Sequence, residues 1–203
     1  MAAPAAHADE AVFDGAVLRR APQQARSRDK VARALAAAER LASQGGPGAL
    51  SLTAVAREAG VSVGALHQYL PDRDAIVRAL VTRYHARFES LMTALVAGPA
   101  VSSEDPVALV VDAFADIYRR SAGLRALGAE TGGRDDASLA HKARMAALLA
   151  ELLRARGLRH DPVVARTAFV TADALLHEAF RDDRRGDDAV LEQLRLLLRG
   201  YLR

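Results

Sequence analysis

Residues 51–70 alternate between helix-starting and helix-ending side chains, which restricts this part of the chain to two short helices joined by a tight turn. Ser51 and Ser62 are suited to cap helices, because a serine oxygen can accept hydrogen bonds from the free backbone N–H groups of a first turn. Gly60 suits the left-handed conformation that ends a helix, and Pro71 prevents the second helix from continuing. Helix, glycine turn and helix together make the helix-turn-helix arrangement.

Apolar residues recur at helical spacing along the rest of the chain, and no segment shows the alternation typical of a strand. Glycine and proline interrupt this periodicity and mark the helix ends. We therefore expect an all-α protein of about nine helices, over residues 27–43, 52–59, 63–70, 73–97, 107–118, 124–127, 138–156, 162–180 and 188–202. Residues 1–24 have no sustained apolar stripe, so we expect a disordered N-terminal tail.

The net positive charge of the chain comes from one segment. Residues 19–83 hold 11 Lys and Arg against 5 Asp and Glu, whereas residues 84–203 hold 17 of each sign. A basic segment of this kind is the electrostatic footprint of a protein that binds nucleic-acid phosphates.

Cysteine is absent, which excludes disulfides, thiolate metal sites and cysteine nucleophiles. We therefore expect a cytoplasmic protein. Arg19 and Arg20 are not followed by the apolar stretch that a twin-arginine export signal requires. No run approaches ~18 consecutive apolar residues, so we expect no membrane-spanning helix.

The helix-turn-helix segment resembles the signature of the TetR family of bacterial transcriptional regulators. Residues 56–70 read AREAGVSVGALHQYL and are followed by Asp72 and Arg73, which is similar to the family pattern VAxxAGVSxGxLYxYFxxK. The resemblance extends over residues 27–85. It departs from the pattern at three positions, with His67 in place of Tyr, Leu70 in place of Phe, and Arg73 in place of Lys.

This resemblance implies a division of labour along the chain. Residues 25–72 would form a three-helix DNA-binding domain, and residues 73–203 a helical domain for effector binding and dimerisation, with the helix at 73–97 connecting the two. The family resemblance further implies a homodimer that binds a palindromic operator in double-stranded DNA and responds to a small-molecule effector. We expect a repressor.

Ten residues carry over by position as candidate DNA contacts, since the second helix of such a motif enters the major groove. The expected phosphate contacts are Ser51, Ser62, Tyr69 and Arg73. The residues expected to face base edges are Thr53, Val63, Ala65, His67 and Gln68, while Gly64 would permit close approach to the duplex. The serines also serve as helix caps, and Val63 and Ala65 can offer only apolar contacts, for instance to a thymine methyl group.

Four arginines precede the first helix on what the sequence predicts to be a flexible arm. These are Arg19, Arg20, Arg26 and Arg28. Such arms can enter the minor groove beside a recognition helix. An ordinary solvated basic tail is the alternative.

The two last predicted helices are apolar on more than one side. Over residues 162–180, one stripe holds Val163, Thr167, Val170 and Ala174, and another holds Phe169, Ala172, Leu176 and Phe180. Residues 188–202 repeat the pattern. Two-sided helices of this kind favour one face on the protomer core and the other on a second copy of the chain.

An effector cavity is expected between the helices of the second region. The candidate lining residues are Phe88, Met92, Phe114, Tyr118, Met145, Leu149, Phe169 and Leu176, with Asp173 and His177 as polar anchors. Plain core packing is the alternative for the apolar residues, and a mutual hydrogen bond for the polar pair. No metal site or cofactor is expected, because further ligands at metal-binding spacing are missing.

Two other classes of protein are alternatives to a DNA-binding repressor. An enzyme is not expected, because the sequence holds no Gly-rich phosphate loop, HExxH motif or serine elbow. A transcriptional activator of the same fold, or a helical binding protein whose DNA-binding role is lost, stays open as the alternative function.

Overall fold

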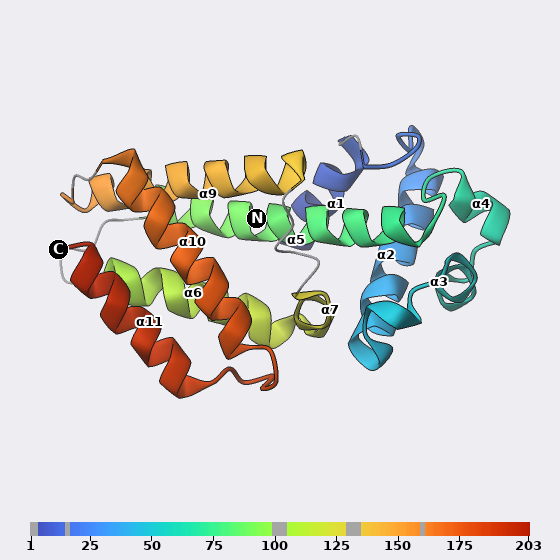
Figure 1. The fold of residues 1–203 in the computed structure, drawn as a ribbon. Helices are drawn as coiled ribbons and strands as arrows, with labels where there is room; N and C mark the ends of the chain where they lie inside the picture. Colours follow the sequence, from blue (N-terminus) through green and yellow to red (C-terminus); the bar gives the residue numbers. More distant parts are fainter. Residues whose placement is uncertain (1–3, 15–16, 99–104, 129–134, 159–160) are drawn as a thin grey trace. The chain divides into compact units, whose positions relative to one another are not determined.

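Helices make up all the regular secondary structure of the computed structural model within the residues that it describes, 4–14, 17–98, 105–128, 135–158 and 161–203. The α-helices are α1 (Pro4–Asp14), α2 (Ala25–Gly45), α3 (Leu52–Ala59), α4 (Val63–His67), α5 (Arg73–Ala97), α6 (Pro106–Arg120), α7 (Ala122–Ala126), α9 (Asp136–Ala155), α10 (Pro162–Ala179) and α11 (Asp188–Tyr201), with a short 3-10 turn, η1 (Pro47–Ala49), before α3 (Figure 1). The all-α prediction is confirmed. Among the described residues, α1 is the one α-helix beyond the nine expected.

The chain folds into two compact units, which are described separately here. Unit 1 contains Met1–Arg87 and Ala122–Thr131, and unit 2 contains Phe88–Ser121 and Gly132–Arg203. Helix α5 therefore belongs to both units, and the boundary expected at residue 73 falls inside unit 1. The chain also returns to unit 1 for α7 before it completes unit 2.

Unit 1 is built around α2, which packs against α3, α4 and α7. The buried side of α2 is mostly alanine, with Val31 and Leu35 as its larger members. Small side chains allow neighbouring helices to approach closely. From the first half of α5, Ile76, Leu80 and Tyr84 complete the core with no exposed surface.

The predicted disordered tail is wrong for the described part of residues 1–24. Helix α1 occupies Pro4–Asp14 and buries Ala8, Val12 and Phe13 against unit 1. Its apolar stripe spans barely two turns within an alanine-rich segment, so the periodicity is too short to stand out in the sequence. Residues 1–3 and 15–16 of the predicted tail lie outside the described residues.

A buried ionic cluster joins α1, α2 and α5 within unit 1. The guanidinium of Arg83, which is only 7% exposed, lies 2.8 Å from Asp9 and 3.5 Å from Glu39. Arg87 also pairs with Glu39, at 3.3 Å, and lies over the Tyr84 ring. Burial raises the pKa of Asp9, although the two arginines act to lower it. The charges balance only while α1 is docked.

Unit 2 packs α6, α9, α10 and α11 with the second half of α5. Contacts run from α9 to α10, from α10 to α11, and from α11 back to α6. An aromatic group links α5, α6 and the end of α10: Phe88 lies 5.0 Å from Phe114 and 5.7 Å from Tyr118, which stacks on Phe180 at 5.0 Å.

No helix in the described ranges is both long enough and apolar enough to cross a bilayer.

The pairing of α9 with α5 in unit 2 predicts a dependence of stability on pH. Glu89 on α5 accepts hydrogen bonds from His141 at 2.7 Å and Arg144 at 2.8 Å. Partial burial acts to raise the pKa of Glu89, but these two partners outweigh it and lower the pKa to about 2 from 4.5. A carboxylate with a lowered pKa stabilises the fold above its unfolded pKa, and this contribution disappears as the pH falls toward the folded pKa.

We expect Glu89→Gln to lower the free energy of unfolding by about 2 kcal/mol near neutral pH. The difference from the wild type should shrink as the pH falls from about 4.5 toward about 2. Denaturant unfolding at a series of pH values measures it. Glu151→Gln is the matched control, since Glu151 is half exposed and lies 3.9 Å from its partner. Equal pH profiles for the wild type and Glu89→Gln would contradict the prediction.

Candidate nucleic-acid interface and ligand cavity

The turn between α3 and α4 is closed by backbone hydrogen bonds from Gly60 and Val61. Gly60 adopts the left-handed conformation, with φ 65° and ψ 37°, at the end of α3. Its N–H and that of Val61 then return to carbonyls of the last turn of α3. A side chain at this φ would be strained, which explains the glycine. The turn fixes the direction in which α4 leaves α3.

Both predicted serine caps are present. The Ser51 hydroxyl accepts from the N–H of Ala54 at 3.1 Å, and the Ser62 hydroxyl accepts from the N–H of Ala65 at 3.2 Å. Helix α4 ends at His67, before the predicted Leu70, and the chain passes into a tighter turn in which the N–H of Tyr69 bonds the Leu66 carbonyl.

All ten candidate DNA contacts lie on the accessible surface of unit 1. The burial of Leu66 and Leu70 against the core turns the opposite side of α4 outward. The exposed members are Ser51, Thr53, Ser62, Val63, Gly64, His67 and Gln68, and the half-buried ones are Ala65, Tyr69 and Arg73. The fold thus leaves every member of the candidate set accessible.

Two positions of α4 hold residue types that the packing of unit 1 does not explain. Val63 is 41% exposed, although it is apolar. A Cβ added at Gly64 would meet no atom within 4 Å, so nothing inside the protein requires a glycine there. A glycine within a helix costs about 0.5–1 kcal/mol relative to alanine. Both choices are understandable if α4 must press closely against another surface.

Arg73, a candidate phosphate contact, is already engaged within unit 1. Its Nε donates to the carbonyl of Pro47 at 3.3 Å, and one terminal nitrogen lies 3.2 Å from Asp74. The side chain therefore ties η1 to the start of α5. Asp72 caps the same end of α5, accepting from the N–H of Ala75 at 2.7 Å.

A cavity of about 30 Å³ lies in unit 2, between α5, α6, α9, α10 and α11. Its lining is almost wholly apolar. Half of the predicted pocket residues line it: Met92, Phe114, Leu149, Phe169 and Leu176. The other lining residues, which the sequence did not single out, are Pro106, Val107, Val110, Val111, Leu153, Ala168, Ala172, Leu198 and Leu202. The apolar stripes of α6 and α11 were visible in the sequence, but which side of each helix faces a gap was not.

The remaining predicted pocket residues, Phe88, Tyr118, Met145, Asp173 and His177, do not line the cavity. The polar ones bond one another instead. The Tyr118 hydroxyl lies 3.2 Å from a ring nitrogen of His177, and His177 Nδ1 lies 2.8 Å from the backbone carbonyl oxygen of Asp173. Burial raises the pKa of Tyr118, with the Asp173 charge adding to the effect. Among the described residues, no three His, Asp or Glu side chains gather as metal ligands would.

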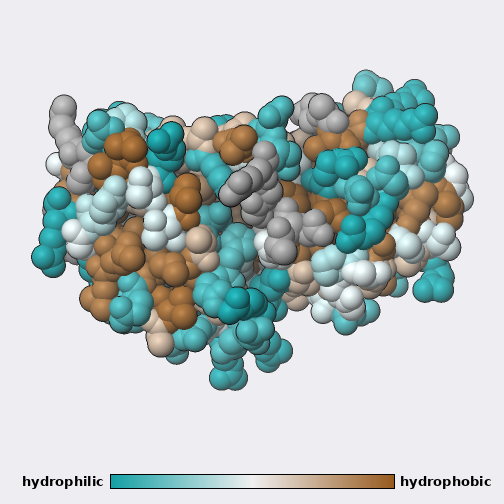
Figure 2. Space-filling view, viewed as in Figure 1, coloured by the Kyte–Doolittle hydropathy of each residue, from teal (hydrophilic) through white to brown (hydrophobic). Residues whose placement is uncertain are grey.

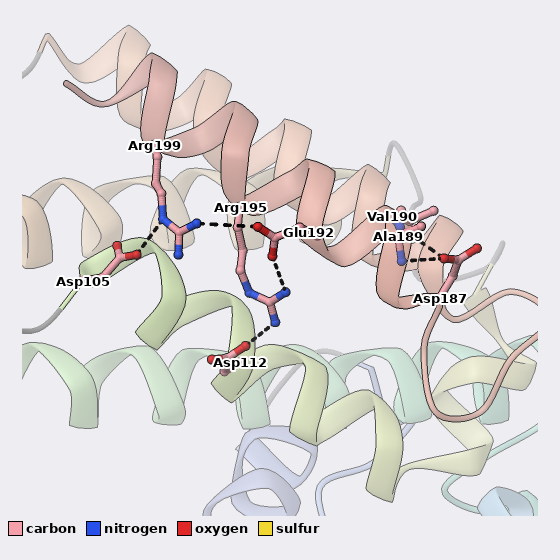
Figure 3. Close-up of polar contacts among 8 residues, drawn as sticks. All are labelled: Asp105, Asp112, Asp187, Ala189, Val190, Glu192, Arg195 and Arg199. Carbon is pink, nitrogen blue, oxygen red and sulfur yellow. Dashed lines mark hydrogen bonds and ion pairs between the residues drawn. The ribbon is translucent and has the colours of Figure 1, made fainter.

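Ion pairs hold α11 against α6 (Figure 3). Arg199 bonds Asp105 at 2.7 Å, and Arg195 bonds Asp112. Glu192, which precedes the two arginines on α11, pairs with both, at 3.5 Å from Arg195 and 3.9 Å from Arg199. Asp105 and Arg199 are the chain neighbours of the lining residues Pro106 and Leu198, so this ion pair joins the start of α6 to the last turns of α11 beside the lining.

The outer faces of α10 and α11 are apolar and exposed. On α10, the stripe of Val163, Thr167, Val170 and Ala174 is exposed, whereas the other stripe, Phe169, Ala172, Leu176 and Phe180, is buried. On α11, Leu196, Leu197 and Tyr201 are each 43–51% exposed. Figure 2 shows hydrophobic side chains gathered over these two helices. We call this surface the α10–α11 face.

The helix-turn-helix and the helical second unit together define a class of DNA-binding regulators, and comparison with known proteins agrees. The sequence matches the family model "Bacterial regulatory proteins, tetR family" over residues 34–80 and the model "Tetracyclin repressor-like, C-terminal domain" over residues 103–202. The chain belongs to the TetR family of transcriptional regulators. No curated protein matches the sequence.

Solved structures share the fold over most of their length. A TetR-family transcriptional regulator from Streptomyces coelicolor has 27% identity and a TM-score of 0.70, over 87% of this chain and 97% of that one. Another TetR-family member from the same organism has 25% identity and a TM-score of 0.58, over 86% and 98%. The fatty acid degradation regulator FadR of Bacillus halodurans has 18% identity and a TM-score of 0.63, over 84% and 98%.

Gly64→Ala should separate stability from DNA binding. The added methyl group meets open space within the protein, so the free energy of unfolding should stay the same or rise by about 0.5 kcal/mol. Affinity for DNA should fall by about tenfold or more, about 1.4 kcal/mol, because the methyl group keeps α4 from the duplex. Thermal unfolding and DNA titration measure the two effects. Unchanged affinity in a stable variant would show that α4 does not approach DNA at Gly64.

Proposed function

We propose that this protein is a ligand-responsive repressor that acts in the cytoplasm and binds a palindromic operator as a homodimer. The observation that carries the proposal is the outward surface of α4, where an exposed valine and an unexplained glycine stand among polar side chains. A surface of this kind fits the major groove, in which apolar contacts and hydrogen bonds to base edges read the sequence.

The DNA contacts divide by chemistry. Ser51, Ser62, Tyr69 and Arg73 contact backbone phosphates and set the position of the protein. Thr53, Val63, Ala65, His67 and Gln68 face the bases, with hydrogen-bonded readout from Thr53, His67 and Gln68. Phosphate contacts give affinity that falls with salt, and base contacts give sequence preference.

The dimer forms through the α10–α11 face. Contiguous apolar patches on a protein surface commonly mark sites where another molecule binds. An interface between identical chains is most often two-fold, with the same patch used on both copies. Two recognition helices related by such an axis read two half-sites of opposite direction, which is why the operator is palindromic.

The effector is an apolar, uncharged molecule that enters the cavity of unit 2. The lining offers almost no polar partner, and burying a charged group without one is costly. The cavity has room for about one water molecule, so an effector enlarges it by moving the lining side chains.

The two sites are coupled through α5. One end of this helix holds Arg73, and the other holds Met92, which lines the cavity. A ligand pressing on Met92 shifts α5 and thereby changes how the two recognition helices of the dimer match the operator. Coupling of this kind requires that the ligand prefer one of two arrangements of the helix.

Two other functions use the same fold. An activator would bind the same DNA but recruit rather than block transcription, and a binding protein with no DNA role would use only the cavity. The excess of positive charge in residues 19–83 favours the DNA-binding alternatives.

Selection of bound sequences from a random duplex pool, at two salt concentrations, tests the function. We expect enrichment of a two-fold palindrome that persists at the higher salt. Binding without any enriched motif, lost at moderate salt, would contradict sequence-specific regulation. A reporter gene placed behind the selected operator then separates a repressor from an activator by the sign of the response.

A charge on the α10–α11 face should prevent dimer formation. Val170 is 45% exposed on α10, and Val170→Glu would bury a carboxylate in the interface, at a cost of several kcal/mol. Sedimentation should show a folded monomer. Leu139→Glu is the matched control, because Leu139 is 53% exposed on α9, outside the α10–α11 face. A dimer that survives Val170→Glu would place the interface elsewhere.

A neutral alkyl compound should bind the cavity more tightly than its charged analogue. We expect n-decanol to raise the melting temperature more than decanoate does, because the lining cannot pair a carboxylate. Val111→Ile adds one methylene group to the lining and should reduce the n-decanol shift while keeping the fold. A larger shift from decanoate, or no change in Val111→Ile, would contradict the assignment.

A further inference from the structure

The connection between α1 and α2 is anchored at the end of the recognition helix. Leu18 is 7% exposed, and the backbone N–H of Arg19 donates to the carbonyl of Tyr69 at 3.0 Å. Pro22 is buried, and its carbonyl accepts from Arg28 Nε at 3.3 Å. Figure 1 shows this connection near α4. The segment therefore has a defined position within unit 1.

Helix α1 holds one side of the connection in place. Arg28 pairs with Glu10 of α1 at 3.0 Å and lies over the Phe13 ring. Arg83 pairs with Asp9 of the same helix. Arg28 is thus used within the protein, in contrast to its expected role on a flexible arm.

The side chains of Arg19 and Arg20 are exposed, and no ion pair joins them to a carboxylate among the described residues. Arg26 and Lys30, on the first turns of α2, are exposed in the same way. By contrast, the arginines deeper in unit 1 are paired with acids: Arg28, Arg33, Arg40, Arg83 and Arg87. Within the described part of unit 1, four of the cations without an acidic partner thus lie in residues 19–30, the segment whose Arg19 backbone bonds Tyr69. Arg57 and Arg78 are also exposed and join no carboxylate among the described residues.

The geometry points to a second DNA contact, in which Arg19 and Arg20 bind backbone phosphates next to the bases that α4 reads. This inference rests on the proposed DNA binding of α4. Tyr69 is an expected phosphate contact, and its carbonyl accepts the hydrogen bond from the Arg19 N–H. The backbone of Arg19 therefore lies beside a residue that is expected to contact a phosphate. Because α1 and Leu18 fix the backbone, binding orders only side chains and costs less entropy than ordering a free arm.

Removal of the two charges tests the contact. Each phosphate contact contributes about 0.9 to the slope of log affinity against log salt. On the selected operator, Arg19→Ala/Arg20→Ala should lower affinity at low salt and make this slope about 1–2 units less steep. The selected sequence motif should stay the same, because phosphate contacts carry no base preference.

Arg184→Ala/Arg185→Ala is the matched control. These neighbouring arginines are also exposed but belong to unit 2, and their removal changes the net charge equally. The control should keep the wild-type slope. If the Arg19/Arg20 variant also keeps the wild-type slope while folded, the inference is overturned. Failure of the proposed function is a separate result, in which the wild type itself selects no operator.

A second variant separates a docked contact from a flexible arm. Val12 has no exposed surface, and Val12→Asn would loosen α1 while both arginines and the net charge stay unchanged. We expect several-fold weaker operator binding, with the rest of unit 1 still folded by circular dichroism. Wild-type affinity in Val12→Asn would show that the arginines act without docking, against the inference.

Discussion

The pairing of Arg83 with Asp9 and Glu39 is the interaction on which the arrangement of unit 1 depends. A buried cation is tolerated only with partners, and removing one partner of a buried pair costs about 3–5 kcal/mol. Here the partners come from two other helices, α1 and α2. Since α2 also carries α3 and α4, the N-terminal helix and the helix-turn-helix share one electrostatic centre, although nothing in their local sequences connects them.

Features that local chemistry decides could be predicted from the sequence. The serine caps, the left-handed Gly60 and the two stripes of α10 follow from neighbouring residues alone, and the structure confirms them. Helix α1 could not be predicted in this way. Helix α1 is held by the burial of Val12 and Phe13 and by the pairing of Asp9 with Arg83, about seventy residues away in the chain, and a short alanine-rich stretch gives no sign of so distant a partner.

The candidate sites also differ in how far local sequence determines them. The candidate DNA contacts share one short motif, so their common accessibility follows once the motif folds. The cavity is different, because it is a gap left among five helices and depends on which side of each helix packs inward. Tyr118, Asp173 and His177 were reasonable polar anchors by type, yet they satisfy one another. The ends of α6 and α11 contribute more of the lining than the sequence suggested.

The small size of the cavity affects the effector concentration at which the protein would respond. Its volume of about 30 Å³ is far below that of a typical ligand site, so the unoccupied form is a nearly complete core. Any molecule that enters must first displace core packing, and its apparent affinity is reduced by the fraction of time that the expanded state exists. In the proposed mechanism, the response threshold is set by the packing of lining side chains such as Val111 and Ala172 as much as by contacts with the ligand. Such a threshold could shift through single core substitutions that leave the DNA surface untouched.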